Sequence, residues 1–161
     1  MKQIRLIKDF KILSQGLIQS GDLCEYSRYN HLETTNDWCH INLGYFIDGK
    51  VVGELQIKMV RSVQLTGCVI NIFVDKKFRK QGVGSKLLTD AIRRCKEDLG
   101  CYFIKAMISQ VNIASIKLFK KFNFEYSGTY PDKLSKGKLI LFENYYKYIV
   151  DCALNEPKPI H

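Results

Sequence analysis

The stretch VINIFVDKKFRKQGVGSK, residues 69–86, decides the fold predicted for this chain. It opens with β-branched and aromatic residues, which predict a buried strand. A basic turn follows, and Gly82 and Gly84 then open a helix that should end near Gly100. Its apolar positions recur on one face of that helix, at Val83, Leu87, Leu88, Ala91, Ile92 and Cys95. The chain is therefore predicted to pass from a central strand through a glycine turn into an amphipathic helix.

This turn has the composition of an anion-binding site. The first N–H groups of a helix have no internal partner, and its N-terminus carries partial positive charge. Gly82 and Gly84 lack a Cβ, so a phosphate can approach the backbone closely. Residues 76–86 include five basic side chains and no acidic one. The alternative is a turn whose glycines serve backbone geometry and whose lysines serve solubility. A Walker loop is excluded because its Gly-Lys-Ser/Thr ending is missing, and a dinucleotide fingerprint because its third glycine is missing.

Two motifs in order resemble the GNAT superfamily of acetyl-CoA-dependent N-acetyltransferases. The first is Arg79-x-x-Gly82-x-Gly84 before a helix, and the second is NIASIKLFKKFNF, residues 112–124. The resemblance covers about residues 69–128, and the flanks fit by strand pattern alone. It implies transfer of an acetyl group from acetyl-CoA to a primary amine, directly, in a ternary complex. The amine would belong to a small molecule or to a protein N-terminus or lysine.

The resemblance also implies which residues hold the co-substrate. Backbone groups at the end of the central strand would contact the thioester and the pantetheine arm, and the turn would hold the pyrophosphate. Asn112 would reach the co-substrate from the next helix, or cap that helix, which asparagine does well. The residues concerned are Ile72, Phe73, Val74, Arg79, Lys80, Gln81, Gly82, Val83, Gly84, Ser85 and Asn112.

The catalytic positions depart from the family pattern. The tyrosine that often protonates the CoA sulfur is Phe119, which cannot donate a proton. Cys68 and Met107 stand where relatives carry glutamate bases. Glu54 as base and Tyr146 as acid are the substitutes we expect. Further candidates are Glu143, His31 and His40, and water alone could also serve.

The whole pattern predicts an α/β (α+β) fold. The resemblance implies a mixed, mostly antiparallel GNAT-like sheet of about seven strands flanked by about four helices. Asn123 replaces a family glycine and should tolerate a left-handed backbone. The expected strands are 2–8, 40–47, 51–60, 65–75, 102–109, 124–129 and 139–149, with one or two short helices in 10–27, a loop over 26–38 and a connection over 131–137. Asp48-Gly49 predicts a hairpin turn.

Length and composition set the remaining expectations. The 161 residues and the 46% apolar content predict one domain spanning 1–161, with a frayed tail at about 154–161. No apolar run reaches the ~20 residues of a membrane helix, and the charged N-terminus lacks a signal-peptide core. The six cysteines include no Cys-x-x-Cys pair, so no metal is expected, and reduced thiols in the cytoplasm are the default. Cys68 and Cys95 should be small core residues.

The net charge of +9 favours anionic partners. Two alternatives therefore stay open beside the transferase: acetylation of aminoacyl-tRNA, and a non-catalytic acyl-CoA-binding module. A homodimer is open as well, because dimers are frequent in the resembled superfamily.

Overall fold

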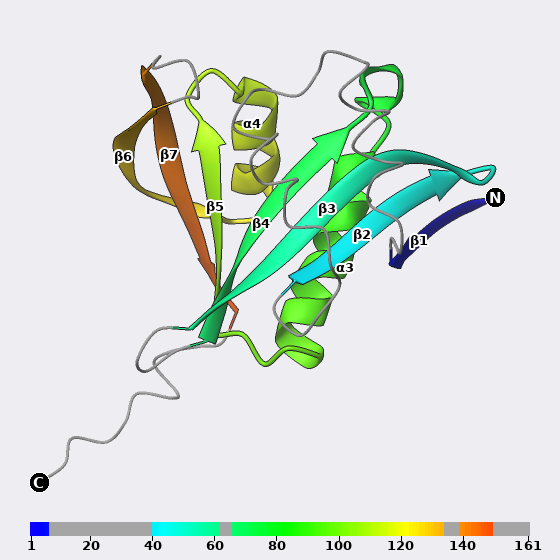
Figure 1. The fold of residues 1–161 in the computed structure, drawn as a ribbon, viewed down its shortest axis with the longest axis horizontal. Coiled ribbons are helices and arrows are strands. Elements are labelled where there is room, and N and C mark those ends of the chain that lie inside the picture. Colours follow the sequence, from blue (N-terminus) through cyan, green and yellow to red (C-terminus); the bar gives the residue numbers. More distant parts are fainter. Residues whose placement is uncertain (7–39, 62–65, 134–138, 150–161) are drawn as a thin grey trace, which may run out of the picture.

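The computed structural model describes residues 1–6, 40–61, 66–133 and 139–149 (Figure 1). The helices expected within residues 10–27, the loop over 26–38, His31 and the C-terminal tail lie outside these ranges. All described strands belong to one seven-stranded sheet with the order β1-β2-β3-β4-β5-β7-β6. The strands are β1 (Lys2–Leu6), β2 (His40–Ile47), β3 (Lys50–Arg61), β4 (Thr66–Val74), β5 (Phe103–Ser109), β6 (Glu125–Lys133) and β7 (Leu139–Tyr148). The predicted mostly antiparallel α/β sheet is thereby confirmed.

The β2–β3 hairpin forms where Asp-Gly predicts it. Asp48 and Gly49 adopt φ values of 48° and 79°, the left-handed backbone that a tight two-residue turn needs. Three long antiparallel pairings, β1–β2, β2–β3 and β3–β4, then carry the chain to the central strand. The pairing of β4 with β5 is parallel, while β5–β7 and β6–β7 are antiparallel.

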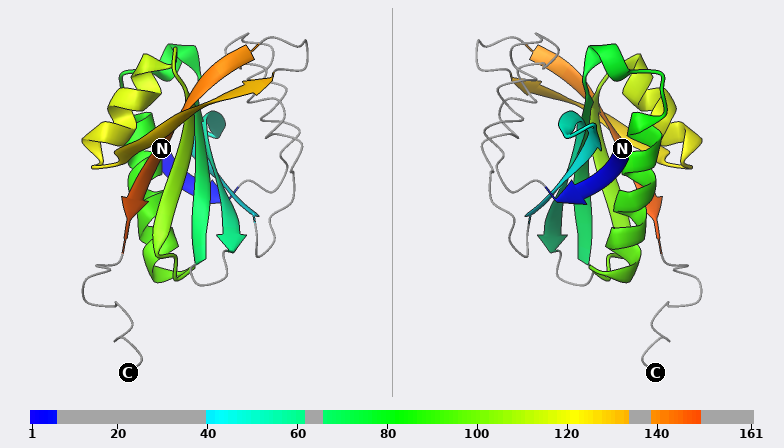
Figure 2. Two further views of the ribbon diagram at one scale, coloured as in Figure 1. Left: turned by 90° about the vertical axis from the view of Figure 1, so that its left-hand side faces the viewer. Right: turned by 90° about the vertical axis from the view of Figure 1, so that its right-hand side faces the viewer.

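Both described α-helices lie on one face of the sheet. These are α3 (Val83–Glu97) and α4 (Ile113–Lys121), and the side views of Figure 2 show them together on one side of the strands. Leu87 and Leu88 of α3 are completely buried, which stabilises the fold by about 1.5–3 kcal/mol for each side chain. A 3-10 turn, η1 (Lys76–Phe78), links β4 to the loop before α3. Among the described residues, none of the helices is long and apolar enough to cross a bilayer.

Two local predictions need correction. β6 continues through Pro131, which the sequence assigned to a connection. Because β6 is the last strand of the sheet, the missing N–H of proline can face away from β7 at little cost. Ile113, expected with the apolar stripe of its helix, is 54% exposed, whereas Ile116 and Phe119 are buried. The left-handed backbone expected at Asn123 is confirmed by its φ of 63°.

Candidate functional site

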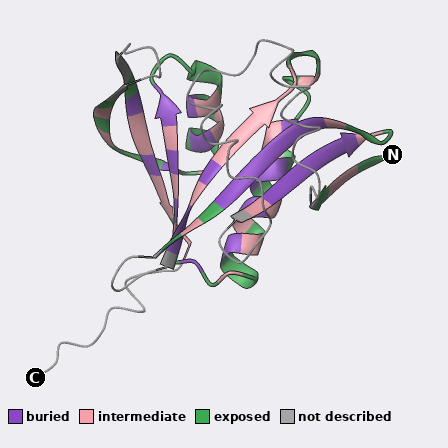
Figure 3. Ribbon diagram, viewed as in Figure 1, coloured by how far each residue is buried: buried purple, intermediate pink, exposed green. Residues whose placement is uncertain are grey.

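The sheet opens at its single described parallel pair. β4 and β5 are in register only over Gly67–Val69 and Phe103–Lys105, and the two strands separate beyond those residues (Figure 1). From Asn71 to Val74, β4 is half-buried, although the neighbouring part of β3 is buried (Figure 3). Beyond Val69, one side of β4 is thereby left without a neighbouring strand among the described residues.

The alternation of backbone groups along β4 decides which of them face this opening. The Asp75 N–H donates to the Val52 carbonyl oxygen at 2.8 Å, so the backbone of Asp75 faces β3. Backbone groups of an antiparallel strand point alternately toward and away from the partner, so Phe73 also faces β3, in register with Glu54. Ile72 and Val74 therefore direct their backbone groups toward the opening. Of the three strand residues expected to bind the co-substrate, these two have the suitable backbone direction.

The turn after β4 presents the N-terminus of a long helix. Gly82 precedes α3 with a left-handed φ of 80°, and no described side chain caps the helix. The Lys86 N–H donates to the Gly82 carbonyl oxygen at 3.0 Å, in the first turn of the helix. The N–H groups of the residues before Lys86 therefore have no acceptor within the helix. Lys80 is left-handed as well, with φ of 59°. Left-handed residues in a turn align successive N–H groups into a concave anion site.

The two glycines of this turn are needed for different physical reasons. A Cβ on Gly84 would lie 3.1 Å from Leu118 Cδ2 of α4 and 3.8 Å from Val74 Cγ2, so Gly84 allows close packing of helix against helix and strand. A Cβ on Gly82 would meet no described atom within 4 Å. Gly82 is therefore required by its backbone angle, and the space beside it is open.

Cations surround the turn and stay exposed. Lys76, Lys77, Arg79, Lys80 and Lys86 are all exposed, and the first turn of α3 contains no acidic residue. The Arg79 Nε donates to the Val74 carbonyl oxygen at 3.0 Å, which fixes the end of β4 against the turn. The Gln81 amide donates to the Lys77 carbonyl oxygen at 3.2 Å. These residues form a basic, preorganised turn at the open end of the sheet.

Asn112 is an N-cap in this structure. Its Oδ1 accepts from the Ser115 N–H at 3.2 Å at the start of α4, and its side chain is exposed. The cap uses the side-chain oxygen and leaves the amide NH₂ as a separate donor. The capping role is thus present, and a second contact to a ligand is chemically compatible with it.

Glu54 lies in the middle of β3 and is completely buried. Burial disfavours the charged carboxylate and raises the pKa of Glu54 well above its ordinary value. Glu54 is in register with Gly44 of β2 and Phe73 of β4, and Gly53 beside it faces Val83 of α3. Since successive side chains alternate between faces, Glu54 points to the face opposite the helices. Glu54 is therefore a buried carboxyl on that face whose neutral form is favoured by its surroundings.

Tyr146 lies on the same face, at the other side of the opening. It is half-buried, its ring centroid lies 6.0 Å from that of Phe103, and the Lys105 Nζ lies 5.7 Å from its ring centroid. The register relates Tyr146 through Lys105 to Val69, whereas Glu54 pairs with Phe73. Strand spacings then place Glu54 and Tyr146 roughly 14 Å apart across the sheet and roughly 13 Å apart along it. The structure therefore does not bring the two expected catalytic residues into one contact set.

Phe119, at the usual position of the acid, and Glu143 each contact neighbouring side chains of the protein. Phe119 is 2% exposed and packs edge-on against Phe124, with ring centroids 4.9 Å apart. Glu143 accepts from the Tyr145 hydroxyl at 2.6 Å. Burial, followed by this contact with Glu143, raises the pKa of Tyr145 to about 12. Tyr145 pairs with Ala106, next to Tyr146 in the chain and thus on the helix-covered face. Glu143 shares that face, away from Glu54.

A row of side-chain amides on the face opposite the helices was missed by the sequence reasoning. Asn42, Gln56 and Asn71 are in register across β2, β3 and β4, and the first two are 2% and 8% exposed. The row crosses the sheet between the levels of Phe73 and Val69. Polar residues at alternate positions, Glu54-Leu55-Gln56-Ile57-Lys58, were the available signal. Such alternation usually marks a solvated face, but here Asn42 and Gln56 are buried and Asn71 is half-buried.

A mixed sheet that opens at its parallel pair, with a basic glycine turn at the end of the opening strand, is the architecture of a GNAT-type acyltransferase. The chain belongs to the acetyltransferase (GNAT) family, whose profile matches residues 12–124. It is similar to the L-amino acid N-acetyltransferase AaaT of Escherichia coli strain K12, at 33% identity over 84 residues, 52% of each chain. It is also similar to an N-alpha-acetyltransferase of Sulfolobus acidocaldarius, at 30% identity over 87 residues, 48% of this chain and 52% of the other. The matched part spans about half the length of these relatives.

Solved structures share the fold. An N-acetyltransferase from Staphylococcus aureus Mu50 has a TM-score of 0.75 at 23% identity, covering 93% of this chain and 99% of the other. Arabidopsis thaliana NAA60, solved in complex with acetyl-CoA, has a TM-score of 0.75 at 15% identity, covering 92% of this chain and 99% of the other. At these identities the likeness shows the fold and leaves the substrate open.

Proposed function

We propose that this protein transfers an acetyl group from acetyl-CoA directly to a primary amine, within a ternary complex. The observation that carries the proposal is the combination of an opened β4–β5 pair with a basic, uncapped helix N-terminus at the end of β4. The turn suits a diphosphate, and the backbone of Ile72 and Val74 suits an amide-containing arm lying beside β4. The relatives to which the chain is similar, among them an L-amino acid N-acetyltransferase, an N-alpha-acetyltransferase and a probable spermine N(1)-acetyltransferase, support an amine as acceptor.

The turn and strand would position the co-substrate as follows. Residues 79–85 hold the pyrophosphate through backbone N–H groups and surrounding cations. The extended arm then follows β4 from Val74 back toward Val69, where β4 and β5 meet. Its hydrogen bonds would come from Ile72 and Val74, and the Asn112 NH₂ offers one more donor. This arrangement fixes the acyl end on the face that carries the amide row, and orientation alone supplies effective molarities of about 10⁵–10⁸ M.

Proton transfer needs residues of this chain as well. A lysine-like amine with a pKa of about 10.4 is almost entirely protonated at neutral pH, so it must lose a proton before it attacks. We propose Glu54 as the base, acting through intervening water, and Tyr146 as the acid near the acyl end. Their separation means that each acts on its own side of the reacting centre. The amide row Asn42, Gln56 and Asn71 would orient the acceptor between them.

The acceptor is proposed to be a small molecule or a protein N-terminus or lysine, and the protein is proposed to act in the cytoplasm. Cys68, Cys95 and Cys101 are free thiols in the described part of the chain, which suits a reducing compartment.

Thermal unfolding with acetyl-CoA, CoA and ATP tests the co-substrate. A ligand at about 100 times its Kd stabilises by about 2.7 kcal/mol, which raises Tm by about 5–10 °C in a domain of this size. We expect such a rise with acetyl-CoA and CoA and none with ATP. An equal rise of Tm with ATP would mean that the turn binds anions in general. No rise of Tm with either CoA species would contradict the proposal.

A further inference from the structure

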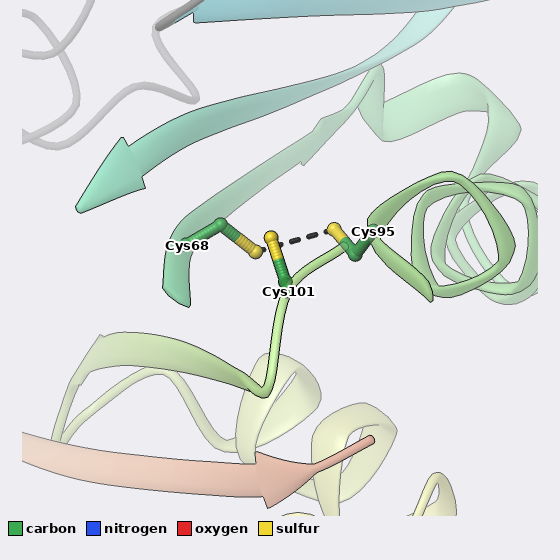
Figure 4. Close-up of side chains that lie close together, drawn as sticks. All are labelled: Cys68, Cys95 and Cys101. Carbon is green, nitrogen blue, oxygen red and sulfur yellow. Dashed lines mark hydrogen bonds between the residues drawn. The ribbon is translucent and has the colours of Figure 1, made fainter. Parts of the chain in front are cut away.

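Three cysteines that are distant in sequence meet beneath the paired end of β4 and β5. Cys68 belongs to β4, Cys95 to α3, and Cys101 to the connection before β5 (Figure 4). Their exposed fractions are 0%, 0% and 1%. The three Sγ atoms lie within 4.8 Å of one another, and those of Cys68 and Cys95 are 3.2 Å apart. The core burial predicted for Cys68 and Cys95 is confirmed, but the spacing of the cysteines gave no sign of this cluster.

A fourth sulfur adjoins the cluster. The Cys101 thiol donates to Met59 Sδ at 3.7 Å, and Met59 of β3 is in register with Cys68 of β4. Four sulfur atoms from β3, β4, α3 and the connection before β5 therefore lie together, the three cysteines buried and Met59 half-buried. No histidine or carboxylate of the described residues joins the three thiols as a possible ligand.

We propose that Cys68, Cys95 and Cys101, with Met59 beside them, form a binding site for a monovalent copper ion. Thiolate and thioether sulfurs are soft ligands that select Cu(I). Zinc favours four tetrahedral ligands from thiolate, imidazole and carboxylate, and among the described residues the fourth group at this site is a thioether. Cu(I) accepts two or three sulfur ligands, so the donor set matches copper better than zinc.

The geometry is close to what such an ion requires. With metal–sulfur bonds of about 2.3 Å, a trigonal arrangement places its three sulfurs about 4 Å apart. This separation lies between the 3.2 Å of the Cys68–Cys95 pair and the 4.8 Å limit of the cluster. Small rotations of the thiol side chains, each moving a sulfur by less than about 1 Å, therefore reach it without a change of fold.

The site is remote from the proposed co-substrate turn. Cys95 lies near the C-terminal end of α3, and at 1.5 Å per residue it is about 18 Å along the helix from Val83. A bound ion would join that end of α3 to β4 and to the connection before β5. Copper binding and acetyl-CoA binding can therefore be measured independently, and failure of one does not imply failure of the other.

The test is anaerobic titration of the full chain with Cu(I), using bicinchoninate as the competing chelator. The reference protein is the triple variant that removes the other thiols, Cys24→Ser, Cys39→Ser and Cys152→Ser. We expect one copper per chain in the wild type and in this variant, with an ultraviolet sulfur-to-copper charge-transfer band. In the triple-variant background, Cys95→Ala or Cys101→Ala should weaken copper binding at least 100-fold.

Met59→Leu provides a milder variant that keeps the size and apolar character of the side chain. It should retain the fold and weaken copper binding about tenfold if the thioether contributes. Circular dichroism and the acetyl-CoA thermal shift report folding of every variant. Loss of stoichiometric copper binding in the triple variant, or unchanged affinity in folded Cys95→Ala, would overturn the site. Tighter binding of Zn(II) than of Cu(I) would overturn the choice of ion.

Discussion

Replacement of Gly82 by alanine separates an anion-binding turn from a turn that is only structural. Gly82 has φ of 80°, and an added Cβ would meet no described atom within 4 Å. The cost to folding is therefore backbone strain alone, about 1–2 kcal/mol for an L-residue in the left-handed region. At roughly 2–4 °C for each kcal/mol, Tm should fall by about 2–8 °C.

Gly49→Ala is a matched control. Gly49 has φ of 79°, and its added Cβ would likewise meet no described atom within 4 Å. It lies in the β2–β3 turn, outside the proposed site. Both variants should therefore lose similar stability, while only Gly82→Ala places a methyl group where the phosphates are proposed to lie.

The assay is calorimetric titration with acetyl-CoA, supported by melts of each variant with and without the ligand. We expect the affinity of Gly82→Ala to fall at least tenfold, which corresponds to about 1.4 kcal/mol, and that of Gly49→Ala to stay at the wild-type value. Equal acetyl-CoA affinity in the two variants, with equal losses of Tm, would refute the assignment of this turn to the pyrophosphate.

Three further predictions concern the catalytic face and the second helix. Glu54→Gln should lower the acetylation rate about 10²–10⁴-fold and remove the rise of rate with pH. Because burial raises the folded pKa of Glu54, its stabilising contribution is complete below the ordinary value of 4.5 and declines as pH rises through the raised pKa. Glu54→Gln should therefore raise Tm, relative to wild type, more at about pH 8 than at about pH 5, and equal Tm differences at both pH values would contradict the buried carboxyl. Tyr146→Phe should lower kcat about 10²-fold or more. The control Tyr145→Phe removes a hydroxyl on the opposite face and should affect stability alone. Equal losses of kcat in the two variants would show that Tyr146 is not the acid. Asn112→Ala should destabilise the protein by about 1 kcal/mol through loss of the helix cap. Asn112→Ser should restore Tm, because serine also caps, but should leave a higher KM for acetyl-CoA. Full recovery of both Tm and KM would show that Asn112 acts only as a cap.

The sequence predicted most of the fold because its signals are local. Asp48-Gly49 requires a tight turn, and the spacing from Val83 to Cys95 determines which side of α3 is buried. The extension of β6 through Pro131 was missed because proline is excluded from a strand only where its N–H would be needed. Whether β6 lies at the edge depends on the order of the strands, which no local pattern contains.

The site was predicted less completely because it depends on contacts between distant segments. The turn around Gly82 was predicted from adjacent residues, but the amide row needs the registers of β2, β3 and β4 together. The separation of Glu54 from Tyr146 likewise follows only from the strand order. The cysteine cluster joins positions 68, 95 and 101, whose spacing resembles no metal motif.

Direct detection of acetyl transfer tests the central claim of this account. The purified protein would be incubated with acetyl-CoA and a panel containing amino acids, polyamines, peptides with free N-termini and aminoacyl-tRNA, and the products identified by mass spectrometry. We expect an acetylated amine, formed with stoichiometric release of CoA at a rate that falls about 10²-fold or more in Tyr146→Phe. Tight binding of acetyl-CoA without turnover of any amine would contradict it and indicate a protein that binds acyl-CoA without catalysis.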